Sequence, residues 1–211
     1  MANKLNVNPT RQELLKLKIK LKTAQRGHKL LKEKRDGLMK NFMEIIREAK
    51  KLREEIEQEL GRGFFSFIFA SGKMRRSELN EALLVPTKKV TLEAKTKNVM
   101  GVDVPIFTYQ EEGHFLAYDL ASTSTSIDRA LITFSAAIQR MVTLAEIEHS
   151  AQLLAQEIEK TRRRVNALEY VFIPDMAETI RYIQSKLNEQ ERGALVTLMK
   201  VKEIITREAD A

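Results

Sequence analysis

The chain has 211 residues, of which 43% are apolar and 31% are charged, and it contains no cysteine. The absence of cysteine excludes disulfides and thiolate metal sites. No apolar run approaches the roughly 20 residues that a membrane-spanning helix requires, and MANKLNVNPT lacks the apolar core of a signal peptide. We therefore expect a soluble chain without direct membrane insertion, and the aromatic content of 6% favours an elongated molecule.

The net charge of +7 is concentrated near the N-terminus. Residues 10–40 contain eleven lysines and arginines against three acidic residues, a local charge of +8, whereas the remainder of the chain is nearly balanced. A basic segment of this kind can bind nucleic acid, an anionic membrane or an acidic protein surface, or it can simply face solvent. Composition alone leaves these alternatives open.

A long helix is predicted over residues 10–60. Thr10 and Glu13 have the spacing of a capping box, and no proline follows until Pro86. Apolar residues then recur at alternating steps of three and four, which is the pattern of a heptad seam and requires a partner helix along its length. The seam positions are Leu14, Leu17, Leu21, Ala24, His28, Leu31, Arg35, Leu38, Phe42, Ile45, Ala49, Leu52 and Ile56.

Residues 61–121 are predicted to form a connecting segment. Gly61, Gly63 and Gly72 weaken helix around the aromatic run 64–69, for which we favour burial, since aromatic residues tend to bury where elements converge. An exposed aromatic patch would instead mark a docking site. Alternation over residues 89–94 and 99–109 predicts a small β-hairpin, in which Pro105 is typical of an edge strand.

A second long helix is predicted within residues 122–211, with a bend or break near Pro174. The two helices pack most economically on each other, so the expected fold is mainly α. It consists of a long antiparallel two-helix coiled coil, formed by residues 1–60 and 122–211, with the hairpin and a helical segment at the connecting end. The second seam consists of Leu144, Ile147, Ala151, Leu154, Ile158, Thr161, Val165, Leu168 and Phe172.

The charged residues beside the seams predict a register. In an antiparallel coil, Arg164 should face Glu48 or Glu55, because all three occupy the same heptad position. Arg162 also flanks the seam and is expected to pair with acidic residues across the helices. Arg163 points away from the seam, so it is either available to another protein or solvated.

We find no catalytic, cofactor or metal site in the sequence. Gly72-Lys73 is followed by Met74, and Phe67 stands where the first glycine of a phosphate-binding loop should be. His28, His114 and His149 are far apart, and His28 on the seam is more typical of a polar register residue than of a metal ligand.

Several longer segments resemble one family, the D subunits of the V/A-type ATPases. The most specific is EKTRRRVNALEYVFIP at residues 159–174, followed by RYIQSKLNEQER at 181–192. RGHKLLKEKRD at 26–36, NVMGVDVP at 98–105 and Asn8-Pro9-Thr10-Arg11 also match. The resemblance covers both helices and the hairpin, and it is weakest at GRGFFSFIFASG.

This resemblance implies a non-catalytic central rotor shaft in a cytoplasmic complex peripheral to the membrane. Both termini would enter a ring of catalytic A and B subunits, the F subunit of the stalk would bind along the shaft, and the connecting end would seat on the d/C subunit. The shaft would couple ATP hydrolysis or synthesis to proton or sodium transport.

Specific residues can be placed in that picture. Arg163 would contact the F subunit or the ring, and the bore of the ring would receive Arg11, Lys16, Lys18, Lys20 and Lys22. The alternative class is a basic antiparallel coiled-coil adaptor that binds an anionic membrane or nucleic acid.

Overall fold

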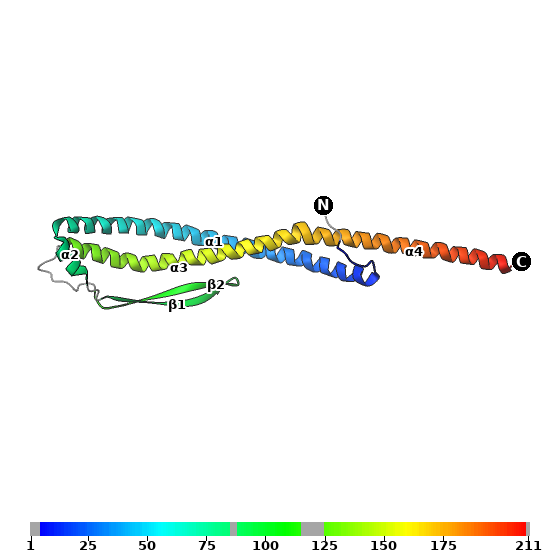
Figure 1. The fold of residues 1–211 in the computed structure, drawn as a ribbon, viewed down its shortest axis with the longest axis horizontal. Helices are drawn as coiled ribbons and strands as arrows, with labels where there is room; N and C mark the ends of the chain where they lie inside the picture. Colours follow the sequence, from blue (N-terminus) through cyan, green and yellow to red (C-terminus); the bar gives the residue numbers. More distant parts are fainter. Residues whose placement is uncertain (1–4, 85–87, 115–124, 210–211) are drawn as a thin grey trace. The chain divides into compact units, whose positions relative to one another are not determined.

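The computed structural model describes residues 5–84, 88–114 and 125–209, and it confirms a mainly α fold with a long helix pair and a small hairpin (Figure 1). Helices α1 (Arg11–Lys73) and α2 (Arg76–Leu83) come first. Strands β1 (Lys89–Val99) and β2 (Val102–Glu112) form one antiparallel sheet. Helix α3 (Thr125–Ala167), the π-helical turn η1 (Leu168–Phe172) and helix α4 (Ile173–Ala209) complete the chain.

The chain divides into two compact units, each with its own core. The terminal unit comprises Met1–Asp36 and Glu159–Ala211, and the central unit comprises Gly37–Ile158. In the terminal unit, α1 packs on α4 through a core of Leu17, Met176, Ile180 and Ile183. In the central unit, α1 runs antiparallel to α3. The core of this unit consists of Leu38 from α1, Leu154 and Ile158 from α3, and Val102 and Val104 from the hairpin.

The predicted seam of α1 is confirmed. Every seam position from Leu14 to Ile56 is buried or half-buried, including the polar residues His28 and Arg35. The seam of α3 behaves in the same way from Leu144 onward, with Leu154 fully buried. Burial of the apolar stripe is therefore what selects the facing sides of these helices.

Helix α1 continues to Lys73, well past the end predicted at residue 60. Gly63 and Ala70 follow Ile56 at heptad spacing, and both are buried, so they extend the seam with small side chains instead of ending the helix. The aromatic run lies off this seam. The prediction that it is buried was wrong for Phe64, Phe65, Ile68 and Phe69, which are 53–74% exposed, whereas Phe67 is half-buried.

The predicted interruption next to Pro174 is found as the π-helical turn η1. The N–H of Ile173 donates to the carbonyl oxygen of Leu168, five residues back, which is the π-helical pattern. The wider turn inserts one residue, so Met176 follows Leu168 by eight positions where a heptad would give seven. As a consequence Phe172, a predicted seam residue, is 54% exposed, while Met176 is buried.

The hairpin is confirmed, and its tight turn is Met100-Gly101. Both residues have positive φ, 52° and 85°, as a two-residue type I′ turn requires. The Asn98 Oδ1 accepts the Gly101 N–H at 3.0 Å and so holds the turn closed. A Cβ on Gly37 would lie 2.8 Å from the Met100 Cε, so the small residue at position 37 lets Met100 lie against α1.

By length and composition, the helical run Thr125–Ile205 contains one stretch of 18 residues apolar enough to cross a membrane, and 11% of that stretch is buried within this chain. A search for uninterrupted apolar runs misses it. Helices that pack on other helices share this composition. Helix α3 reaches the core farther along, where Leu154 and Ile158 pack with Leu38 of α1.

Two glycines of α1 provide a matched test of the extended seam. A Cβ at Gly61 would meet nothing within 4 Å, whereas one at Gly63 would lie 3.0 Å from the Phe134 ring. Gly61→Ala should stabilise the protein by about 0.5–1 kcal/mol through helix propensity. Gly63→Ala should gain less than this or lose stability, as measured by urea unfolding. Equal effects of the two substitutions would contradict the seam at Gly63.

The π-helical turn should tolerate a deletion that the rest of the helix does not. Deleting Val171 together with Pro174→Ala makes Met176 follow Leu168 by seven positions, so an ordinary helix keeps the seam in phase. Deleting Arg163 instead turns the following core residues away, at about 1.5–3 kcal/mol each. Both deletions shorten the helix equally. Urea unfolding should show a small loss for the first and a large loss for the second; the opposite order would refute this account of the turn.

Candidate interaction surfaces

The basic residues predicted to meet a partner are all exposed on α1 of the terminal unit. They lie off the seam because Leu14, Leu17 and Leu21 occupy it. Two of them already have acidic neighbours: Arg11 pairs with Glu191 of α4, and the Lys16 ammonium lies 2.8 Å from the Glu13 carboxylate. Exposed ion pairs of this kind contribute only about 0–1 kcal/mol to stability, so the basic residues can exchange these partners for others. The basic surface is defined as Arg11, Lys16, Lys18, Lys20 and Lys22.

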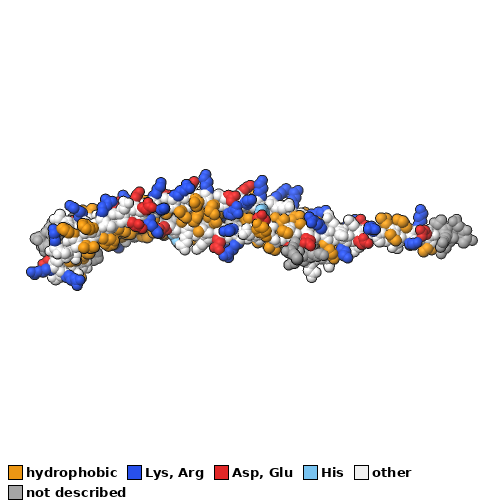
Figure 2. Space-filling view, turned by 90° about the horizontal axis from the view of Figure 1, so that it is seen from above, with side chains coloured by type: hydrophobic (Ala, Val, Ile, Leu, Met, Phe, Trp, Pro, Cys, Tyr) orange, Lys and Arg blue, Asp and Glu red, His pale blue; other side chains and the backbone are white. Residues whose placement is uncertain are grey.

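An apolar surface that was not predicted lies on α4 beyond Glu191. Helix α1 begins at Arg11, which pairs with Glu191, and α4 continues to Ala209. The large apolar side chains of this extension are 46–65% exposed, and hydrophobic atoms gather near the C-terminal end in Figure 2. Its sequence signal is that apolar residues spread beyond one heptad seam: Leu198, Val201 and Ile205 keep steps of three and four, and Leu195, Val196, Met199 and Ile204 flank them. This C-terminal apolar surface consists of Leu195, Val196, Leu198, Met199, Val201, Ile204 and Ile205.

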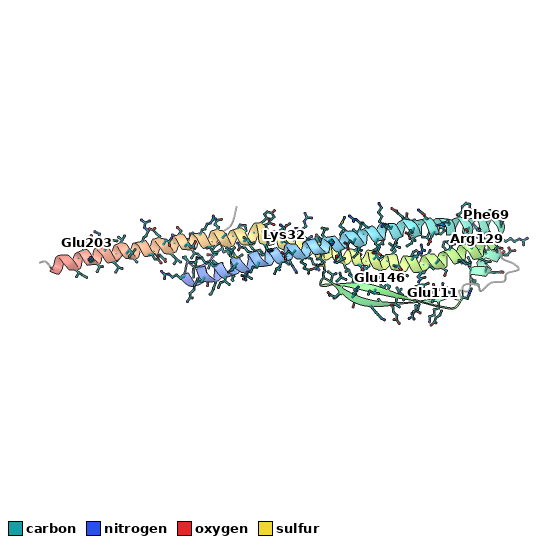
Figure 3. All side chains as sticks on the ribbon, turned by 180° about the vertical axis from the view of Figure 1, so that it is seen from behind. Lys32, Phe69, Glu111, Arg129, Glu146 and Glu203 are labelled. Carbon is teal, nitrogen blue, oxygen red and sulfur yellow. The ribbon has the colours of Figure 1, made fainter. Side chains whose placement is uncertain are left out.

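A second apolar surface, here called the aromatic surface, lies on α1 of the central unit and consists of Phe64, Phe65, Ile68 and Phe69. Phe64 packs edge-on against Phe134 of α3, with ring centroids 5.2 Å apart. The Lys73 ammonium lies 4.3 Å from the centre of the Phe69 ring, which is labelled in Figure 3. Exposed apolar residues gathered in this way are typical of a docking surface.

The three arginines 162–164 are exposed. Arg163 is not free of partners, because its guanidinium pairs with Glu159 one turn earlier on the same helix. Within residues 5–84, 88–114 and 125–209, no ion pair joins Arg162 or Arg164 to an acidic residue. The cluster is therefore a solvent-facing basic group in the terminal unit.

The register expected from the heptad positions needs correction. In the central unit, the Arg140 guanidinium lies 2.8 Å from the Glu59 carboxylate and 3.9 Å from that of Glu55. Arg53 likewise pairs with Glu148. Glu55 therefore faces Arg140 instead of Arg164. Heptad positions specify which face of each helix is buried. Sliding one helix along the other by seven residues keeps the same faces in contact, so heptad positions do not specify which residues of the two helices lie opposite each other.

His28 is a polar residue on the seam, as predicted. Its Nε2 is buried and makes no hydrogen bond, and it lies 3.4 Å from the carboxylate of Glu169 in the π-helical turn. Among the residues that the structure describes, no group of three His, Asp or Glu side chains gathers as a metal site would require.

A polar clasp joins the open end of the hairpin to α3. The Lys88 ammonium lies 2.7 Å from the Glu111 carboxylate and donates to the Ser135 Oγ at 2.5 Å. Tyr109 donates its hydroxyl hydrogen to Glu111, labelled in Figure 3. Burial, together with this hydrogen bond and the Glu111 charge, raises the pKa of Tyr109 to about 12. The hydrogen bonds from Lys88 and Tyr109 lower the pKa of Glu111.

The fold and its surfaces define the class of the protein. It is a helix-pair protein whose exposed charged and apolar groups lie on the outer faces of its helices and on the hairpin, so these surfaces are available for binding to other molecules. The comparisons with known proteins narrow this class to one family.

A family model for the D subunit of ATP synthase matches residues 13–203. The V-type ATP synthase D subunit of Clostridioides difficile is 52% identical over 209 residues, which cover 98% of this chain and 94% of that protein. The D subunits of the V-type ATP synthases of Acetivibrio thermocellus and Fusobacterium nucleatum are each 47% identical over 209 residues. The matches cover 97% and 98% of this chain, and 94% and 99% of those proteins. The chain therefore belongs to the family of V-type ATP synthase D subunits.

The clasp makes a pH prediction. Since the pKa of Tyr109 is raised on folding from about 10, the stabilisation that its neutral hydroxyl provides is complete below pH 10 and is lost between pH 10 and about 12. Glu111→Gln should lower the pKa of Tyr109 towards 10. The difference in tyrosinate absorbance between each protein and its Tyr109→Phe variant reports that pKa. An unchanged value in Glu111→Gln would show that Glu111 does not hold the proton on Tyr109.

Proposed function

We propose that this chain is the central rotor shaft of a V-type ATP synthase. In this role it catalyses nothing and transmits torque between the catalytic A and B ring and the membrane ring that translocates ions. Membership of the D-subunit family supports the assembly, and the helix pair supports the mechanical role. Two helices whose seams interdigitate resist bending and twisting better than one helix alone.

The C-terminal apolar surface is the observation that carries the proposal. A single helix with apolar side chains on its exposed faces is unfavourable in water, since burial contributes about 1.5–3 kcal/mol for each large apolar side chain. The ring bore is the enclosure that would cover it. The basic surface belongs to the same terminal unit and would provide long-range attraction without the deep pockets that would lock a turning shaft.

The remaining partners follow from the other surfaces. The aromatic surface of the central unit would seat on the d/C subunit, which connects the shaft to the membrane ring. The F subunit would bind along the helix pair, where Arg163 is available on the outer face despite its exposed pair with Glu159. The protein would thus be cytoplasmic and attached to the membrane only through the complex.

Reversal of the charges on the basic surface tests the role of the terminal unit. The variant changes Arg11, Lys16, Lys18, Lys20 and Lys22 to Glu. Five exposed interactions of up to about 1 kcal/mol each predict a loss of affinity for the ring of about tenfold to a thousandfold, with the largest loss at low salt. Helicity should be retained because these residues lie off the seam.

A matched control reverses five exposed charges on α1 of the central unit, away from the aromatic surface: Lys40, Arg47, Lys50, Lys51 and Arg53. Coupling of ATP hydrolysis to ion movement is measured in complexes reconstituted with the F subunit. The charge-reversal variant should lose coupling through its weaker binding to the ring. A second variant, in which Leu195, Leu198 and Met199 are changed to Ser, should lose coupling as well. If both terminal-unit variants couple fully, the terminal unit does not seat in the ring. Salt-sensitive binding to anionic vesicles or DNA instead would favour the adaptor alternative.

A further inference from the structure

The two edges of the hairpin are not equivalent. The Phe107 N–H donates to the Glu146 Oε2 of α3 at 2.9 Å, so it points out of the sheet and does not bond to its partner Ala94. Glu146 is labelled in Figure 3. In an antiparallel ladder, backbone groups point inward and outward at alternate residues. Phe107 and Ala94 therefore form a non-hydrogen-bonded pair, and this fixes the outward-pointing residues of both strands.

The outer edge of β2 is closed to further pairing. Pro105, two residues before Phe107, also points outward and has no N–H to offer. The N–H of Phe107 is already occupied by Glu146. A strand approaching this edge would thus find one donor missing and the next one taken by a carboxylate.

The outer edge of β1 is open. Every residue from Lys89 to Asn98 is exposed, and the strand contains no proline and no bulge. By the same alternation, its outward N–H and C=O groups belong to Val90, Leu92, Ala94, Thr96 and Asn98. An exposed edge strand of this length is a template for strand addition.

We propose that the outer edge of β1 pairs with an extended, acid-rich strand of another protein of the assembly. The inference rests on the proposed function, which supplies the assembly, and it adds a site and a mode of binding. The incoming strand hydrogen-bonds to the outward groups of β1 and turns the two-stranded hairpin into a three-stranded sheet.

The side chains of β1 indicate the character of that strand. On one face Val90 and Leu92 are 44% and 49% exposed, and Leu92 lies opposite Tyr109. Residues on this face of the incoming strand would be apolar. On the other face three lysines, Lys89, Lys95 and Lys97, stand against one Glu93, so residues there would be acidic.

The same charges argue against a second copy of this chain as the occupant. Pairing two β1 edges would bring three lysines from each strand onto one face of the new sheet, where like charges repel. Charge complementarity therefore favours a different, acidic protein segment over self-association.

Hydrogen exchange tests the proposal at single amides. In the free chain, the amides of Leu92, Ala94 and Thr96 should exchange fast, while those of Glu93, Lys95 and Lys97 exchange slowly because they bond to β2. The chain is then reconstituted into a complex that lacks its own copy, and exchange is measured again by mass spectrometry with residue-level fragmentation. The outward amides should slow at least tenfold, and the inward amides should stay slow.

Two variants with controls examine the backbone and the charge separately. Ala94→Pro removes one outward N–H and mirrors Pro105 in β2, so the hairpin should remain intact, as slow exchange at Lys95 would verify. It should reduce the new protection at Leu92 and Thr96 at least tenfold, whereas Ala94→Ser should not. Lys95→Glu with Lys97→Glu should have a similar effect, and Lys50→Glu with Lys51→Glu should have none.

The outcomes separate this inference from the proposed function. If the chain enters the complex and restores coupling while its outward amides exchange as fast as before, strand addition is wrong and the shaft proposal stands. If the chain does not enter the complex, both fail. Protection that depends on the concentration of the free chain would identify a second copy as the occupant and overturn the proposal. Protection that survives the lysine reversals would overturn the acid-rich character of the strand.

Discussion

The phase of the apolar seam is the constraint on which the rest of this structure depends. Two helices can bury a continuous stripe only if each keeps its apolar residues on the facing side, turn after turn. At Gly63 and Ala70 the helices meet this demand with small residues, and α1 remains intact through Gly61 and Gly63. At η1 they meet it by widening one turn, which returns Met176 to the core beside Pro174. Both features look local, yet each is a consequence of the same long-range fit.

Much of the fold could be predicted because the packing of the two helices appears in the sequence as a regular spacing of apolar residues. Residues spaced by three and four identified the seam, and alternation of apolar residues identified the hairpin. The end of α1 was missed since glycine usually weakens a helix, and a seam made of Gly63 and Ala70 carries no hydrophobic signal. The aromatic run was misplaced for a related reason. Its residues are strongly apolar, but their positions relative to Ile56 put them off the seam, and position decided burial.

The interaction surfaces were predicted less completely, because charge patterns are less specific than packing. The basic residues of α1 are exposed as expected. The partner of Glu55 depends on which residue of α3 lies opposite it, and that residue is Arg140. Arg163 has an acidic neighbour one turn away, a pairing that sequence spacing does contain. The edges of the hairpin differ through one contact, from Glu146 to the Phe107 N–H, that joins residues far apart in the sequence. No local pattern could have revealed it.

The extension of α4 beyond Glu191 has a thermodynamic consequence of its own. Fixing each backbone residue costs about 1–2 kcal/mol of conformational entropy, and an isolated helix of this length is marginal in water. Elsewhere in α4 the core around Ile180 and Ile183 offsets that cost, but the apolar side chains of the extension belong to no core of this chain and stay 46–65% exposed. Its helix–coil equilibrium is therefore set by whatever surrounds it. When a partner surface covers these side chains, part of the free energy of the new contacts offsets the entropy lost in ordering the helix. The measured binding free energy will therefore be smaller than the free energy of the contacts themselves.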